Sequence, residues 1–347
     1  MNTTTEASSS HRSELRTRPI VAVIILIGGL AALALGLAAS ISVGAADIRL
    51  QTVWEALYRF NPDLTQHQII WELRLPRALA GAMVGVGFAV SGAIMQGMTR
   101  NPLADPGLLG INAGAGFVLA LCFAFFPQLP FSRLILFSFL GAAIGTGLVY
   151  GIGSVAKGGL TPVRLALAGA AVSALLVALS EGVAIYFKIS QDLAFWYAGG
   201  VSGTKWMQVN IMWPWIAIGV IGALLLSRSI TVLSLGDEIA AGLGQRTGIV
   251  KLAGALLTLI MAGASVSAVG SIGFIGLVIP HVSRALVGVD YRWIIPCSAV
   301  LGGLLMVLAD MGARMIHPPF ETPIGALIAL IGVPFFLYLA RRERRGL

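Results

Sequence analysis

Two acidic residues, Glu181 and Asp310, stand inside long apolar runs of this 347-residue sequence. A charged group at membrane depth is costly, so such a residue usually serves transport, a proton relay or an ion pair. Asp310 lies one helical turn before Arg314, which could neutralise it within the helix. Glu181 precedes Lys188 by one or two turns and could line a water-filled pathway. Neither residue belongs to the acid-rich relay that proton-coupled transporters usually show.

Other patterns that could do chemistry are weak. The stretch AGGVSGTKW near residue 200 has glycines and a lysine but lacks the G-K-[ST] order of a phosphate-binding loop. Cys122 and Cys297 each sit in an apolar run without metal-ligand spacing, and His281 has no metal partner in its surroundings. No paired carboxylates or Ser-His-Asp arrangement can be defended. We expect no enzyme activity, no metal site and no directly bound cofactor.

The composition indicates a membrane protein. Hydrophobic residues make up 57% of the chain and charged residues 11%, against about 25% charged in an average soluble domain. The 43 glycines favour close helix packing, as is usual between transmembrane helices. The net charge of +8 is carried by loops between apolar runs and lacks the aromatic residues of a nucleic-acid surface. We therefore expect an all-α, polytopic protein in contact with lipid, and no nucleic-acid partner.

Apolar windows bounded by Pro, Gly, Asn and charge predict about ten spans. They lie near residues 19–43, 77–97, 107–126, 132–155, 163–187, 207–228, 248–269, 273–287, 293–316 and 323–340. An even number of spans and the distribution of Lys and Arg place both termini in the cytoplasm. We assume that the membrane is the cytoplasmic membrane of a bacterium. We expect a disordered cytoplasmic tail at 1–18, a single transmembrane domain at 19–340 and a basic cytoplasmic tail at 341–347.

The two halves of the chain echo each other. LAGAMVGVGFAVSGA from Leu79 leads to PGLLGINAG, and LAGALLTLIMAGASVSA from Leu252 leads to GFIGLVIPH. The first copy would start outside and the second inside, so the pattern predicts an inverted repeat. Chance similarity between two Gly/Ala-rich helices is the alternative.

Three segments carry most of the information: residues 74–110, 228–250 and 270–293. They contain RLPR, NPLADPGLLG, LSLGDEIAAGLG and GFIGLVIPH, in that order. This combination resembles the FecCD-type permease family, the membrane subunits of ABC importers for ferric siderophores, haem and cobalamin. The resemblance covers about 20 to 340 and implies a cobalamin-importer-permease-like fold, a second permease subunit (identical or not), two cytoplasmic ABC ATPases that bind ATP, and an extracytoplasmic substrate-binding protein.

The resemblance also implies site residues. The coupling loop at 231–245 would grip the ATPase through Leu233, Ser234, Leu235, Gly236, Asp237, Glu238, Ala241 and Gly242; an ordinary loop is the alternative. Asn101, Leu103 and Thr161 match the family's cytoplasmic gate, although Asn101-Pro102 could simply make a rigid turn. Arg74, Arg77 and Arg314 match arginines that meet glutamates on the binding protein. Headgroup anchoring of Arg74 and Arg77, and pairing of Arg314 with Asp310, are the alternatives.

The function that the resemblance implies is ATP-driven import of a ferric siderophore across the cytoplasmic membrane by alternating access. Haem or cobalamin is an alternative cargo, and a secondary transporter that uses Glu181 is a less favoured alternative function. The identity of the chelate, the type of cell envelope and the residues that contact cargo are left open by the sequence.

Overall fold

The computed structural model describes residues 17–43, 48–155, 161–316 and 322–343, and within these ranges the chain is helical without a strand. Each of the ten predicted spans corresponds to a helix. These helices are α1 (Pro19–Ser42), α4 (Leu75–Thr99), α5 (Ile111–Phe125), α6 (Phe131–Val155), α7 (Pro162–Phe187), α9 (Trp206–Ser234), α11 (Thr247–Val269), α12 (Ile275–Val287), α13 (Tyr291–Ile316) and α14 (Ile324–Glu343). The predicted all-α membrane fold is confirmed. Most of the predicted tail at 1–18 and the end of the tail at 341–347 lie outside the described residues.

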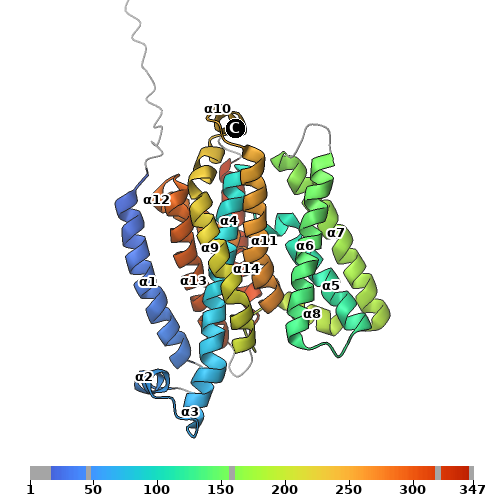
Figure 1. Cartoon of the computed structure of the whole chain (residues 1–347). Coiled ribbons are helices and arrows are strands. Elements are labelled where there is room, and N and C mark those ends of the chain that lie inside the picture. Colours follow the sequence, from blue (N-terminus) through green and yellow to red (C-terminus); the bar gives the residue numbers. More distant parts are fainter. Residues whose placement is uncertain (1–16, 44–47, 156–160, 317–321, 344–347) are drawn as a thin grey trace, which may run out of the picture.

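In the part of the chain that the structure describes, six short helical segments connect the long helices. They are α2 (Leu50–Tyr58), α3 (Thr65–Gln68), the π-helical turn η1 (Ile69–Arg74), the 3₁₀ turn η2 (Pro106–Leu109), α8 (Ser190–Ala198) and α10 (Asp237–Gly242). Sequence periodicity predicted only α10 among them. Figure 1 shows α10 at one end of the bundle and α2 and α3 at the other. We call these the α10 end and the α2 end.

Helix α4 is the centre of the bundle. It packs against α13, α9, α11 and α12, and nearly every side chain from Val84 to Met98 is buried. Glycines allow this contact, because a methyl group on Gly85 would collide with the carbonyl of Gly302 on α13. A methyl group on Gly92 would likewise collide with the backbone of Gly276 on α12. Helices in lipid are held together by such close packing rather than by a hydrophobic driving force.

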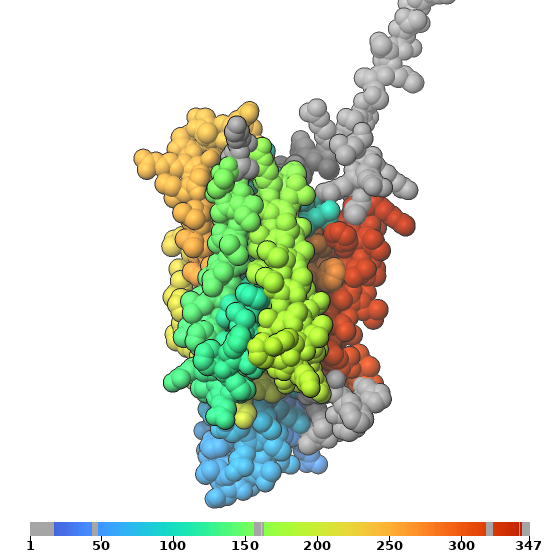
Figure 2. Space-filling view, turned by 90° about the vertical axis from the view of Figure 1, so that its right-hand side faces the viewer, coloured from blue at the N-terminus to red at the C-terminus, as the bar shows by residue number. Residues whose placement is uncertain are grey.

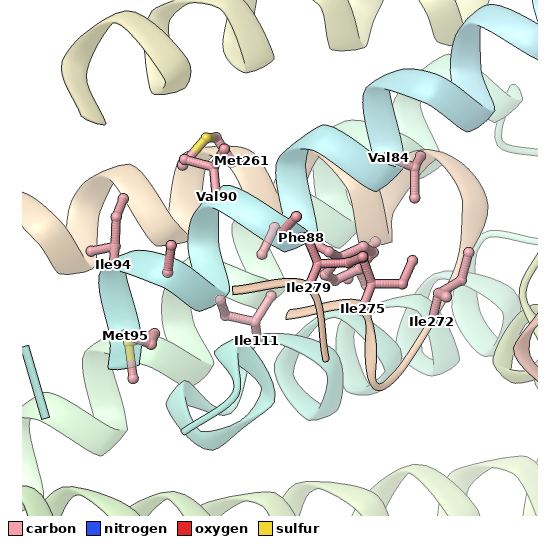
Figure 3. Packing of buried hydrophobic residues seen from close by; sticks show 14 of the residues in the cluster. Val84, Phe88, Val90, Ile94, Met95, Ile111, Met261, Ile272, Ile275 and Ile279 are labelled. Atoms are coloured by element: carbon pink, nitrogen blue, oxygen red, sulfur yellow. The ribbon is translucent and has the colours of Figure 1, made fainter. Parts of the chain in front are cut away.

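Apolar side chains fill the remaining space around α4. Figure 3 shows Phe88 of α4 in one cluster with Ile275 and Ile279 of α12, and all three are buried. Among the described residues, seven helices are long and apolar enough to cross a membrane, whereas α5, α12 and the apolar part of α14 are shorter. Two of these short helices, α5 and α12, each follow an irregular segment that is partly buried in the bundle: residues 100–110, which include η2, and residues 270–274. Irregular backbone at this depth is tolerated only where protein surrounds it.

The predicted inverted repeat appears as two hairpins of opposite direction. The α4–α5 connection lies at the α10 end, where Arg100 pairs with Asp237, whereas the α11–α12 connection lies deeper in the bundle, where a Cβ on Gly270 would collide with the carbonyl of Trp196 on α8. The two connections meet inside the bundle, since a Cβ on Gly276 would lie 2.8 Å from Pro106 Cδ. Opposed broken helices of this kind are common in transporters.

Candidate functional site

Helix α10 forms a short projection between α9 and α11 at one end of the bundle (Figure 1). Gly236 has φ of 132°, a conformation that side chains other than glycine rarely adopt, and it turns the chain into α10. Leu233 and Ala240 are buried and fix this turn on the bundle. In contrast Leu235, Ile239 and Leu243, spaced four residues apart, are 59%, 54% and 69% exposed. The predicted coupling segment is therefore a rigid elbow with an apolar outer stripe.

The acidic start of α10 is tied to two neighbouring helices. Asp237 accepts a hydrogen bond from Lys251 Nζ on α11 at 2.9 Å, and Arg100 Nη2 lies 3.7 Å from the same oxygen. Arg100 ends α4 in a left-handed conformation, with φ of 52°. Both pairs are partly exposed, so each contributes about 0–1 kcal/mol and serves to set position. Sequence reasoning named Asp237 but missed Lys251 and Arg100.

The predicted gate loop begins directly after Arg100. Asn101 Oδ1 accepts a hydrogen bond from Leu103 N at 2.9 Å, and Asp105 Oδ1 accepts one from Gly107 N at 2.8 Å. These two turns make the loop rigid, as one of the two interpretations of Asn101 and Leu103 expected. The structure thus brings the candidate gate next to the candidate coupling segment, through Arg100 and Asp237. A role in gating stays a prediction.

Thr161 lies at the same end of the bundle but on a different helix. It caps α7, and its hydroxyl accepts a hydrogen bond from Arg164 N at 3.4 Å. Further along α7, Gly169 faces the carbonyl of Leu108, so η2 packs directly on this helix. The link between Thr161 and the Asn101 loop therefore runs through the packing of η2 on α7.

A buried polar side chain supports α12 where Pro280 interrupts its backbone hydrogen bonds. Pro280 lacks an N–H, which leaves the carbonyl of Gly276 without its usual helical partner. Gln96 Nε2 on α4 donates to the Gly276 carbonyl at 3.3 Å and to the Leu277 carbonyl at 3.1 Å. Arg284 Nη2 donates to Gln96 Oε1 at 3.3 Å. This network fixes α12 to α4 beside the candidate gate, and sequence reasoning did not find Gln96.

The three arginines predicted to meet a binding protein lie at the α2 end, and two of them, Arg74 and Arg314, hold the end of α1. Arg74 Nη1 donates to the carbonyls of Ile41 and Ser42, each at 2.7 Å. Arg314 Nη1 donates to the carbonyls of Ser40 and Val43 at 3.0 and 3.1 Å. Cationic donors at the last carbonyls stabilise the end of a helix.

Asp310 is shared between two of these arginines. Arg77 Nη2 lies 2.8 Å from Asp310 Oδ1, and Arg314 Nη2 lies 3.0 Å from Asp310 Oδ2. The pairing of Arg314 with Asp310, one of the two predicted alternatives, is present. The side chains of Arg77 and Arg314 are only 13% and 10% exposed. Docking of a binding protein through these arginines stays a prediction.

Glu181 lies on the exposed face of α7. Figure 2 shows a hollow in the surface between α7 and α14. A cavity of about 420 Å³ opens beside α14 toward the α2 end. Its lining is small or aromatic and contains no charged residue among those described: Tyr197, Ala198, Ser271, Gly273, Phe274, Pro323, Gly325, Ala326 and Ala329.

Comparison with known proteins identifies the family that has this architecture. The sequence pattern of the FecCD transport family matches residues 32–342. The chain belongs to the FecCD transport family. The iron(3+)-hydroxamate import system permease protein FhuB of Bacillus subtilis (strain 168), a protein similar to this FecCD member, is 57% identical over 340 residues, 98% of this chain and 88% of that protein. The ferric enterobactin permease FepD of Escherichia coli (strain K12) is 38% identical over 93% of this chain and 96% of its own.

A solved structure is also similar to this FecCD chain. It is described as an inward-facing metal-chelate type ABC transporter, and it matches with a TM-score of 0.81 and 29% identity over 92% of this chain and 99% of that one. Together with the long apolar helices, these similarities make the chain a multi-pass permease component of a bacterial membrane transporter rather than an enzyme.

Proposed function

We propose that this FecCD protein is the permease subunit of an ABC importer that moves a ferric siderophore across the bacterial cytoplasmic membrane. The observation that carries the proposal is the α10 elbow, a rigid helix with an exposed apolar stripe that pairs through Asp237 with the residue preceding the gate loop. A projection of this kind is needed only if the chain must bind a separate protein. The iron-hydroxamate relative at 57% identity favours a hydroxamate-type ferric siderophore as cargo.

The proposed mechanism starts with ATP bound by a separate ATPase that contacts α10 from the cytoplasmic side. Leu235, Ile239 and Leu243 would fill a groove in that subunit, and its closure would move α10 as a unit. Because Asp237 is paired with Arg100, the movement would reach the loop of Asn101 and Leu103 directly. The α10 end, where α1 starts and α14 ends, would then face the cytoplasm.

The hollow between α7 and α14 would form half of the cargo pathway (Figure 2). Leu330, Ile331 and Leu337 on α14 are 72%, 60% and 54% exposed, so this helix presents an apolar face toward a second permease subunit, whether identical or different. An external binding protein would deliver the chelate at the α2 end. A wide lining of small side chains would leave most of the selectivity to that protein.

The experiment is uptake of radioactive iron by cells that carry the chain with its native ATPase, its second permease subunit and its binding protein. The panel contains a ferric hydroxamate, a ferric catecholate, ferric citrate and haem, with labelled cobalamin added separately. We expect uptake of the ferric hydroxamate above the level of cells that lack the chain. Uptake of haem or cobalamin alone would refute the siderophore cargo, and uptake of none of the panel would refute the importer.

A further inference from the structure

A second concave surface lies at the α10 end, between the end of α9 and the start of α13. It has a volume of about 390 Å³ and is lined by Arg228, Thr231, Val232, Asp290 and Arg292. Two of these five residues are arginines, and neither belongs to the candidate coupling segment or gate. Thr231 and Val232 belong to the predicted coupling loop at 231–245, but the proposed transport mechanism assigns no role to the two arginines.

Arg292 is held in place by Asp290. Its Nε and Nη2 donate to Asp290 Oδ2 at 2.9 and 2.7 Å, and Asp290 also accepts from the backbone N of Arg292. Burial alone would raise the pKa of Asp290, but the hydrogen bonds and charge of Arg292 outweigh it, so the pKa lies below its usual value. The guanidinium is thus fixed in direction, while the side chain stays 55% exposed and has further N–H donors available.

Arg228 continues the apolar outer stripe of α9. Ile218, Ile221 and Leu225 on this stripe are 52%, 58% and 79% exposed, and Arg228 follows Leu225 by one helical turn. In a membrane such a stripe faces acyl chains, which places Arg228 at the level of the lipid headgroups. Among the described residues Arg228 forms no ion pair, so its charge is available to an external anion.

We propose that Arg228 and Arg292 bind the phosphate of an anionic membrane lipid between α9 and α13. Two guanidinium groups at one concavity suit a phosphate diester, because each offers a planar set of donors to its oxygens. Asp290 neutralises Arg292, so the lining keeps the net positive charge of Arg228 for the phosphate. The exposed stripe from Ile218 to Leu225 runs directly below and offers a surface for the acyl chain. This continuity favours a lipid over free phosphate. Basic pockets between transmembrane helices on the cytoplasmic side are known to hold lipid headgroups.

The concavity adjoins the coupling segment, so a bound lipid would influence the position of that segment. Thr231 lines the concavity and donates from Oγ1 to Asp290 at 3.3 Å, and its Oγ1 accepts from the backbone N of Tyr291 at 3.0 Å. Ser234 Oγ in turn donates to the carbonyl of Thr231 at 2.7 Å, immediately before the turn into α10. A lipid phosphate bridging Arg228 and Arg292 would brace α9 against α13 at the base of this elbow.

The test is native mass spectrometry of the purified full chain in detergent, with dioleoylphosphatidylglycerol or dioleoylphosphatidylcholine added. We expect the wild type to retain phosphatidylglycerol preferentially, and Arg228→Gln to retain it about fivefold less, the effect of one basic residue near an anionic headgroup. Arg228→Lys keeps the charge and should recover most of the retention. Arg246→Gln removes an exposed arginine at the same end outside the concavity and should behave as the wild type.

Three results would overturn the proposal. The first is equal retention by the wild type and Arg228→Gln, with equal melting temperatures. The second is displacement of phosphatidylglycerol by millimolar inorganic phosphate, which would identify a free-phosphate site. The third is loss of ATPase capture by Arg228→Gln with lipid retention unchanged, which would identify a protein contact. Since no cargo is used, failure of this test and failure of the siderophore uptake test are distinguishable.

Discussion

Arg77 on α4 and Asp310 on α13 are separated by 233 positions in the sequence and form a two-pronged contact, with Nε and Nη2 at 3.0 and 2.8 Å from Asp310 Oδ1. The Asp310 side chain is 2% exposed. A carboxylate at this depth is stable only because Arg77 and Arg314 neutralise it together. The pair joins the central helix to α13 at the α2 end, and Arg314 extends the connection to the last carbonyls of α1.

We expect Asp310→Asn to destabilise the protein by about 3–5 kcal/mol, because it leaves two mostly buried arginines without their anion. Thermal unfolding of the purified chain in detergent measures this effect. Asp192→Asn, which removes an exposed carboxylate on α8, is the matched control and should leave the melting temperature nearly unchanged. Equal melting temperatures for both variants would contradict a structural role of the Arg77–Asp310 pair.

Gln96→Leu should destabilise the chain by about 1–3 kcal/mol, since it removes the amide that satisfies the buried carbonyls of Gly276 and Leu277. Hydrogen exchange of α12 followed by mass spectrometry checks the site of the effect. We expect faster exchange in the peptide that contains Gly276 and no change in α6. A uniform increase over all helices would instead indicate general unfolding, and the specific role of Gln96 would be rejected.

Gly92→Ala should prevent normal assembly of α4 on α12, because the added methyl group would collide with the backbone of Gly276. The expected outcome is a sharp loss of folded protein in the membrane fraction, measured by fluorescence-detected size-exclusion chromatography of a tagged chain. Gly147→Ala on α6 is the control, since open space surrounds this glycine. A folded Gly92→Ala protein at control levels would show that this close helix contact is dispensable.

Much of the fold was predictable from the sequence, because length and apolarity alone specify a transmembrane helix. All ten spans were found in this way, including α5 and α12, which were recognised as short. The connecting helices α2 and α8 were missed, since each is only nine residues long. The π turn η1 was missed as well, because no residue pattern distinguishes it from the α-helix that continues into α4.

The candidate site was predictable in part. Asp237 and Asn101 could be named from sequence motifs that resemble those of the FecCD family, but the contact that joins them is made by Arg100, which no motif singled out. The role of Gln96 could not be predicted for a similar reason, because it depends on Pro280 of another helix, 184 positions away in the sequence. Contacts of this kind follow from tertiary packing, which a single sequence does not reveal.

Glu181→Gln separates the proposed importer from a transporter driven by an ion gradient. If Glu181 only lines the pathway, the variant should keep at least about a third of wild-type uptake, because no obligatory proton transfer depends on it. The measurement is iron uptake in cells at matched membrane levels, with and without an uncoupler under conditions that preserve cellular ATP. Complete loss of uptake in the variant, together with full sensitivity of the wild type to the uncoupler, would favour an ion-coupled transporter.

The central claim, that α10 transmits the action of a separate ATPase, is tested most directly by ATP-dependent uptake of a ferric hydroxamate into proteoliposomes that contain the whole transporter. The variant combines Asp237→Arg with Glu238→Arg, and the control is Ser154→Arg, which adds a positive charge at an exposed position of α6 at the same end of the bundle, away from α10. The account predicts that the α10 variant assembles in the membrane but loses uptake, while the control keeps it. Undiminished ATP-dependent uptake by the α10 variant would contradict the account.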